Sequence, residues 1–221
     1  MSDVRRVLFD LDDTLYTNSS GLFREVGRRI ETWTAQALGL SMEDAKALRR
    51  HYYTAYGTTM AGLVREHPEV DIDVYLDYVH DVDVAHYLAP NPALKAMLAD
   101  LRVRKVIFTN SIRDWAERVT RQLGIREHFE AIYDVRTTDY RSKPDPHTYE
   151  RVLAELDVPG EACVMLDDQP AYLRGAQAYG MRTILVSPDG EAEDGVDYAV
   201  SDGLAAAPIL KQLVADGHGR E

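Results

Sequence analysis

Four short apolar runs are spaced along the chain, and each is bounded by charged, polar or turn residues. They are "VLF" at 7–9, "VIF" at 106–108, "CVML" at 163–166 and "TILV" at 183–186. Runs that are apolar at every position predict strands buried on both faces, as in a parallel sheet. We predict further strands at "AIYDV", 131–135, and at "YAV", 198–200.

Helical patterns lie between and after these runs. They cover about 113–123, 146–156 and 170–179, and Gly180 is placed to cap the last of them. Alternation of strands and helices predicts an α/β fold, with a doubly wound, Rossmann-like, mostly parallel sheet.

The segment from about 19 to 87 breaks this alternation, because it carries helix signals and no convincing strand. Apolar residues recur at helical spacing in "GLFREVGRRIETWTAQALGL". Ser41 with Asp44 resembles a capping box that opens a second helix, Gly57 interrupts it, and "DVYLDYVHDV" predicts a third. We therefore expect an inserted helical cap at 19–87, between the two parts of a sheet core at 1–18 and 88–221.

Composition narrows the class of protein. The 221 residues are 45% hydrophobic, which suffices for a sizeable core. A net charge of -12 argues against nucleic-acid and anionic-membrane surfaces, because their phosphates would be repelled. The single cysteine, Cys163, excludes an internal disulfide. Neither a signal peptide nor a spanning helix is recognisable, so we expect a soluble, cytoplasmic protein, and the sequence leaves its oligomeric state open.

Carboxylates follow two of the apolar runs directly. Asp10, Asp12 and Asp13 come after the first run, and Asp167 with Asp168 ends the third. Ligands of open parallel sheets bind beyond the carboxyl ends of the strands, and residues two apart in extended chain point the same way, so Asp10 and Asp12 can share a pocket. Carboxylates gathered in this way require a hard cation such as Mg²⁺, which prefers oxygen ligands and phosphate-bearing substrates.

Two further segments supply groups that a phosphoryl anion needs. Thr109 and Asn110 lie between a strand and a helix, and Ser111 with Asp114 suggests a capping box whose backbone N–H groups bind an anion.

Lys143, in "RSKPDP", adds a cation. Asp145 and Pro146 behind it suit the N-cap and first position of a helix, which would pin the loop that carries the lysine.

Together these strings resemble the four motifs of the haloacid dehalogenase superfamily: "DLDDT" at 10–14, "FTN" at 108–110, "SKPDP" at 142–146 and "LDD" at 166–168. The helical insertion after the first motif resembles the small helical cap of that superfamily. "FDLDDTLY", "YYTAYGTTMAGL", "YVHD" and "DYRSKPDP" are similar to its pyrimidine 5′-nucleotidase branch.

The resemblance implies a role for each motif residue. Asp10 would attack phosphorus and form an aspartyl-phosphate, and Asp12 would act as acid and then as base. Thr109 would hydrogen-bond a phosphoryl oxygen, and Lys143 would bind the phosphoryl group and the nucleophile.

The resemblance also implies the metal ligands. Mg²⁺ would be held by Asp10, the backbone carbonyl of Asp12, Asp167 and Asp168. Dehalogenation needs neither a second acid nor a metal, so these residues favour phosphate ester hydrolysis.

One departure concerns the residues after the acidic pair. Related sequences often carry Ser and Asn where this chain has Gln169 and Tyr172. We therefore expect the residues around the metal ligands to differ from those in the related proteins.

For the substrate we expect a small phosphorylated metabolite, with UMP or CMP implied by the branch. Asn110 and the cap residues Tyr56, Thr58, Thr59 and His80 are the candidates for binding it. The tyrosines near position 56 also suit packing, and a lone histidine is more often packed than a ligand.

Two alternatives stay open. A sugar phosphate or pyridoxal phosphate could replace the nucleotide, because the core meets only the phosphate. A phospho-accepting receiver domain has a similar residue set, although its acidic pair comes first in the chain and it has no insertion.

Overall fold

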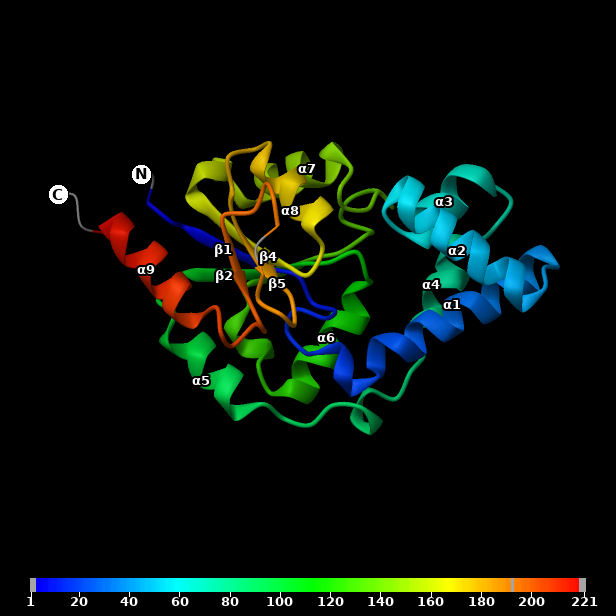
Figure 1. The fold of residues 1–221 in the computed structure, drawn as a ribbon, viewed down its shortest axis with the longest axis horizontal. Helices are drawn as coiled ribbons and strands as arrows, with labels where there is room; N and C mark the ends of the chain where they lie inside the picture. Colours follow the sequence, from blue (N-terminus) through cyan, green and yellow to red (C-terminus); the bar gives the residue numbers. More distant parts are fainter. Residues whose placement is uncertain (1–2, 192, 219–221) are drawn as a thin grey trace.

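A single parallel sheet forms the centre of the molecule (Figure 1). The computed structural model describes residues 3–191 and 193–218. In these residues six strands follow the order β3-β2-β1-β4-β5-β6. They are β1 (Arg6–Phe9), β2 (Arg104–Phe108), β3 (Ala131–Tyr133), β4 (Cys163–Asp167), β5 (Arg182–Val186) and β6 (Tyr198–Val200). The α/β doubly wound prediction is confirmed, including the two weaker strands.

The register of the sheet brings three segments to one edge. Phe9, the last residue of β1, pairs with Ile107 of β2 on one side and with Leu166 of β4 on the other. Because all strands run the same way, the residues that follow Phe9, Ile107 and Leu166 meet at the carboxyl edge of the sheet.

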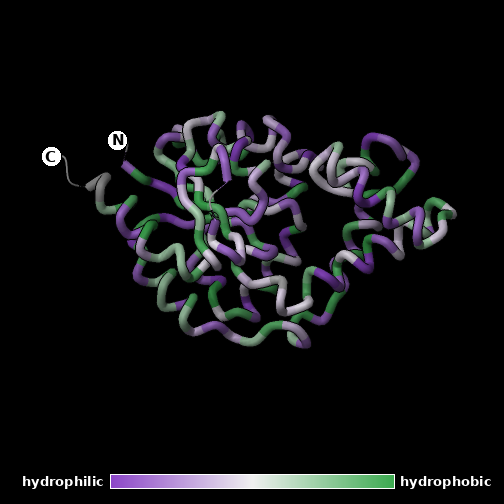
Figure 2. The backbone as a smooth tube through the Cα atoms, in the orientation of Figure 1, coloured by the Kyte–Doolittle hydropathy of each residue, from purple (hydrophilic) through white to green (hydrophobic). Residues whose placement is uncertain are grey.

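Helices cover both faces of this sheet, which explains the continuous apolar runs within its four central strands. On one face Leu8 and Met165 pack in a cluster with residues of α7 (Pro146–Leu156) and α8 (Pro170–Gln177). On the other face Phe9 and Leu166 pack with α5 (Pro92–Asp100), α6 (Arg113–Leu123) and α9 (Ala207–His218). Figure 2 shows the hydrophobic strands enclosed between these layers.

The segment predicted to be helical contains α1 (Leu22–Leu38), α2 (Met42–Tyr56), α3 (Thr59–Glu66) and α4 (Ile72–His80). Short 3₁₀ helices at Asn18–Ser20 and Val84–His86 flank them. These helices lie to one side of the sheet (Figure 1). The division into a core at 1–18 and 88–221 and a cap at 19–87 stays a prediction, and residues 1, 2, 192 and 219–221 lie outside the described part.

Local signals set several helix ends as expected, with one difference. The Ser41 hydroxyl accepts from the Asp44 N–H at 3.1 Å, and Gly57, with φ of 83°, ends α2. Helix α8 ends at Gln177, two residues before the predicted end, and the Gly180 N–H donates to the Gln177 carbonyl at 2.9 Å in the turn that follows. In the described ranges the structure has no helix with the length and apolar character needed to cross a bilayer.

Candidate active site

Lys143 lies at the centre of the carboxyl edge of the sheet. Its Nζ donates to Asp10 Oδ1 at 2.9 Å, to Asp167 Oδ2 at 2.6 Å and to the Phe108 carbonyl at 2.9 Å. The lysine is 0% exposed. Burial alone would lower the pKa of Lys143, but Asp10 and Asp167 together raise it above its usual value. The ammonium is therefore charged, and its three donors are all used.

The loop that carries Lys143 is tied to the sheet on both sides. The Lys143 N–H donates to Asn110 Oδ1 at 2.8 Å, and Asn110 Nδ2 donates to the Lys143 carbonyl at 3.2 Å. Asp145 caps α7 by accepting from the His147 N–H at 3.0 Å, with Pro146 as the first helical residue, as predicted. Asn110 thus braces the lysine loop, a contact that the sequence did not indicate.

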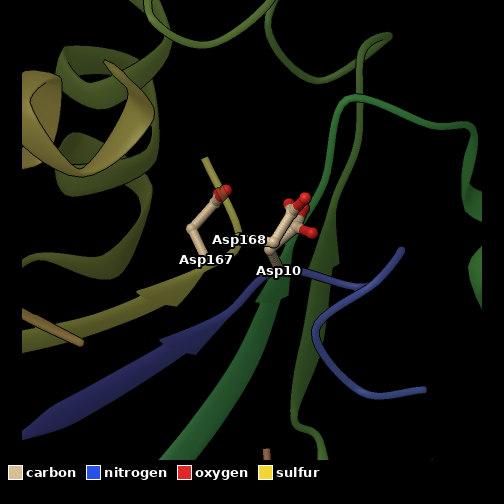
Figure 3. A group of neighbouring side chains, drawn as sticks. All are labelled: Asp10, Asp167 and Asp168. Atoms are coloured by element: carbon tan, nitrogen blue, oxygen red, sulfur yellow. The ribbon is translucent and has the colours of Figure 1, made fainter. Parts of the chain in front are cut away.

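Three carboxylates form an acidic cluster beside this ammonium (Figure 3). One oxygen each of Asp10, Asp167 and Asp168 lies within 4.8 Å of the others. Burial raises the pKa of Asp168 to about 9, with Asp167 and Asp10 adding repulsion. Burial also raises the pKa of Asp167 to about 7, although Lys143 opposes the shift.

This cluster fits a hard divalent cation. Three carboxylates lie beside one ammonium, and burial together with their mutual repulsion raises the pKa of Asp167 and of Asp168, so a bound cation would stabilise their charged forms. An oxygen-only donor set is the kind that Mg²⁺ takes. Asp10, Asp167 and Asp168 could therefore hold a metal ion, as their sequence positions led us to expect.

The Asp12 carboxylate lies outside this cluster. Its Oδ1 accepts from the Tyr16 hydroxyl and from Trp115 Nε1 at 2.9 Å, and its Oδ2 accepts from the Ser111 hydroxyl at 2.7 Å. Burial raises the pKa of Asp12, and these three hydrogen bonds oppose the rise. Only the backbone carbonyl of Asp12 was expected to ligate the metal, and that role stays a prediction.

The sequence missed the partners of Asp12. Tyr16 lies four residues away, a spacing that could have been noticed, but Ser111 and Trp115 are 99 and 103 residues distant. The predicted capping box of Ser111 and Asp114 is wrong. Ile112 precedes α6 without a side-chain cap, because the Ser111 hydroxyl is turned toward Asp12 instead.

A cavity of about 140 Å³ opens above these groups, between the edge of the sheet and the helices α1 to α4. Asp10, Asp12 and Asp168 line it together with Thr109 and Asn110. The Thr109 hydroxyl oxygen, buried here, accepts from the Ser111 N–H at 3.0 Å. The structure thus brings five of the predicted core residues to one cavity, while Lys143 and Asp167 lie buried behind Asp10 without lining it.

Asp13 lies apart from this cavity. Its backbone has φ of 58°, and its side chain lines a neighbouring cavity of about 600 Å³. Asp168 lines both cavities.

The cap candidates are only partly brought to the cavity. Thr58, Thr59 and His80 line it, whereas Tyr56 does not, and the Tyr56 hydroxyl donates to Glu66 at 2.7 Å. Tyr53 lines it from the same helix as Tyr56.

The remaining wall of the 140 Å³ cavity is mostly apolar. It also contains a cation, Arg49, which the sequence analysis did not identify. The apolar residues are Phe23, Val26, Ile30, Met60, Tyr75, Leu76 and Val79.

The two residues that depart from related sequences both contact the centre. The Gln169 backbone N–H donates to Asp167 Oδ1 at 2.9 Å, and its side-chain amide donates to Asp168. The Tyr172 ring centroid lies 5.3 Å from Lys143 Nζ, and its hydroxyl donates to the Gly57 carbonyl at 2.7 Å. Gln169 therefore orients the acidic pair, and Tyr172 joins the lysine to the α2–α3 loop.

Known proteins are similar to most of this chain in sequence. The chain is 27% identical over 191 residues to Phosphate metabolism protein 8 of Saccharomyces cerevisiae, a match that covers 80% of this chain and 60% of that protein, so the chain spans less than two thirds of that relative. It is 28% identical over 233 residues to Tyrosine-protein kinase PtkA of Mycobacterium tuberculosis, covering 94% and 70%. It is 25% identical over 236 residues to Glyceraldehyde 3-phosphate phosphatase of Methanocaldococcus jannaschii, covering 96% and 100%.

A solved structure and a family model also match this chain. CbbY from Rhodobacter sphaeroides, in complex with phosphate, superposes with a TM-score of 0.66 at 25% identity and covers 92% of this chain and 96% of that one. The model of haloacid dehalogenase-like hydrolases matches residues 4–180. With its four motifs joined at one sheet edge, the chain belongs to the haloacid dehalogenase-like hydrolases.

Proposed function

We propose that the protein is a Mg²⁺-dependent phosphomonoesterase that acts through an aspartyl-phosphate on Asp10, with pyrimidine nucleoside 5′-monophosphates, UMP or CMP, as substrates. One observation carries the proposal: a fully buried ammonium joins Asp10 to Asp167 beside a third carboxylate, and Asp10 and Asp168 of this centre line a cavity. Such a centre suits a phosphoryl group, which needs charge compensation on several oxygens at once.

Residues of this chain divide the chemistry between them. The Asp10 carboxylate attacks phosphorus, and its bond to phosphorus forms as the ester P–O bond breaks. Asp12 gives its proton to the leaving oxygen and then takes one from the water that releases inorganic phosphate. Thr109 binds a phosphoryl oxygen, and Lys143 would exchange one of its three hydrogen bonds for another phosphoryl oxygen. When bound at Asp10, Asp167, Asp168 and the Asp12 carbonyl, Mg²⁺ would offset the negative charge of substrate and nucleophile.

The cap side of the cavity is proposed to bind the nucleoside. Thr58, Thr59 and His80 line the cavity and offer hydrogen-bonding groups, while Asn110 is occupied by the lysine loop. On helix α2 it is Tyr53, and not the predicted Tyr56, that lines the cavity.

A second substrate class has support of its own. The archaeal relative named Glyceraldehyde 3-phosphate phosphatase is matched along its full length, so a small sugar-type phosphate is the runner-up. A receiver-type signalling domain is disfavoured, because the family match is to hydrolases.

A phosphate-release screen tests both substrate classes. Mononucleotides, glyceraldehyde 3-phosphate, other sugar phosphates and pyridoxal phosphate are compared with MgCl₂ and with EDTA, and the Asp10→Asn variant controls for contaminating phosphatases. We expect UMP and CMP to have the highest kcat/KM, with turnover lost in EDTA. Preference for a sugar phosphate would overturn the nucleotide assignment, and equal rates in EDTA would overturn the metal dependence.

A further inference from the structure

The two carboxylate oxygens of Asp12 accept hydrogen bonds from different kinds of donor. Oδ1 accepts from the Tyr16 hydroxyl and from the Trp115 indole N–H at 2.9 Å, whereas Oδ2 accepts from the Ser111 hydroxyl at 2.7 Å. Asp12 and Ser111 line the 140 Å³ cavity, but Tyr16 and Trp115 do not. Oδ2 is therefore the oxygen on the cavity side.

These donors differ in what they permit. A serine or tyrosine hydroxyl can donate or accept a hydrogen bond, but an indole N–H can only donate. The oxygen that faces Trp115 must offer a lone pair to it and remain an acceptor. When Asp12 carries a proton, this contact favours Oδ2 as the site of that proton, because an unprotonated carbonyl oxygen is a better acceptor for the indole N–H than a protonated one; Tyr16 and Ser111 can turn their hydroxyls to suit.

The direction of the indole N–H is fixed by its surroundings. Trp115 is 0% exposed, and its ring lies 5.4 Å from the ring of His80 at the end of α4. The Arg118 guanidinium lies 5.3 Å from the indole centroid and donates to the carbonyls of His80 and Val82. The indole is thus held between α6 and the end of the cap helices, so its N–H has one direction in which to point.

We propose that Trp115 is a positioning residue for the acid–base chemistry of Asp12, because its N–H orients the carboxyl group so that Oδ2 presents the proton to the leaving group. The Oδ2–H bond breaks as the ester P–O bond breaks, and the proton passes to the leaving oxygen. Oδ2 later takes a proton from the water that attacks the phospho-Asp10 phosphorus. This inference rests on the proposed phosphatase function.

The test compares two esters that differ in their need for a proton. p-Nitrophenolate is stable enough to leave unprotonated, whereas an alkoxide must receive a proton as it leaves. General-acid catalysis therefore matters chiefly for an alkyl phosphate. We expect Trp115→Phe to lower kcat/KM, which reports the steps up to departure of the leaving group, about tenfold or more for the alkyl phosphate and less than about threefold for p-nitrophenyl phosphate. Equal losses for the two esters, or no loss, would overturn the proposal.

The matched control is Trp33→Phe. Trp33, the other tryptophan of the chain, packs edge-on against Tyr75 with ring centroids 5.0 Å apart. This variant should leave the ratio of the two rates unchanged, because it keeps the Asp12 contact. A similar selective loss in Trp33→Phe would assign the effect to general packing and count against Trp115.

A shape-preserving replacement separates the hydrogen bond from the packing. In the Trp33→Phe background, tryptophan is replaced throughout by 3-benzothienylalanine, in which sulfur takes the place of the N–H, so only position 115 changes. The same selective loss is expected, and undiminished alkyl phosphate hydrolysis would refute the inference. If the unmodified protein hydrolyses neither ester, the proposed function itself fails, and the role of Trp115 falls with it.

Discussion

Replacing Lys143 by Met should unbalance the acidic centre. The change removes hydrogen bonds to Asp10 Oδ1, Asp167 Oδ2 and the Phe108 carbonyl, and it leaves two buried carboxylates without their ammonium partner. Breaking a buried ion pair by removing one partner costs about 3–5 kcal/mol. That is a large part of the ~5–15 kcal/mol by which domains are usually stable.

Urea unfolding near neutral pH, in EDTA and in MgCl₂, measures this effect. In EDTA we expect the free energy of unfolding of Lys143→Met to fall by about 3–5 kcal/mol. Part of the loss should return in MgCl₂, because the carboxylates that lack an ammonium partner in the variant should bind the cation more tightly than the wild-type centre does, and a cation that binds only the folded state stabilises it by mass action. Phosphate release should be abolished in both conditions.

Lys105→Met provides the matched control. Lys105 is also buried, at 8% exposure, but its Nζ donates to the carbonyls of Leu101 and Val103 at 2.6 and 2.9 Å and not to a carboxylate. The stability loss in this variant should not depend on Mg²⁺. A Lys143→Met loss below about 1 kcal/mol in EDTA, or one that MgCl₂ leaves unchanged, would refute the proposed charge balance.

Three other predictions concern single residues. Asp10→Asn should abolish phosphate release while circular dichroism shows the fold intact, and wild-type turnover would contradict its role as nucleophile. Burial lowers the pKa of His80 to about 4, from about 6.5 in an unfolded chain. As the pH falls, the unfolded state therefore takes up the proton first. The free energy of unfolding should drop by up to about 3 kcal/mol between pH 6.5 and pH 4. His80→Asn should remove this part of the pH dependence in urea titrations, and an unchanged slope would contradict it. Gly57→Ala should cost about 1–3 kcal/mol and slow turnover, because φ is 83° and a Cβ would lie 2.7 Å from the Lys143 carbonyl oxygen; stability and kcat equal to wild type would rule this out.

Much of the sheet and its edge could be predicted from local patterns. Strands buried on both faces carry continuous apolar runs, so the four central strands stood out between polar turns, and the edge strands β3 and β6 were predicted from weaker patterns. Asp145 with Pro146, and Gly57, set helix ends through contacts within a few residues. Asp10 and Asp167 could be assigned because parallel strands present their carboxyl ends at one edge, whereas the role of Lys143, which lies in a loop before a helix, was implied by the family resemblance.

Contacts between distant segments could not be predicted in this way. Tyr53 and Tyr56 lie on one helix, and only the packing of α2 decided that Tyr53 faces the cavity. Ser111 had the spacing of a helix cap, but the competing carboxylate of Asp12 took its hydroxyl. The sequence by itself determined which chemical groups stand at the ends of the strands. Only the tertiary structure decided which donor faces which oxygen, because a contact across a hundred residues depends on how helices are oriented against the sheet, which local patterns do not encode.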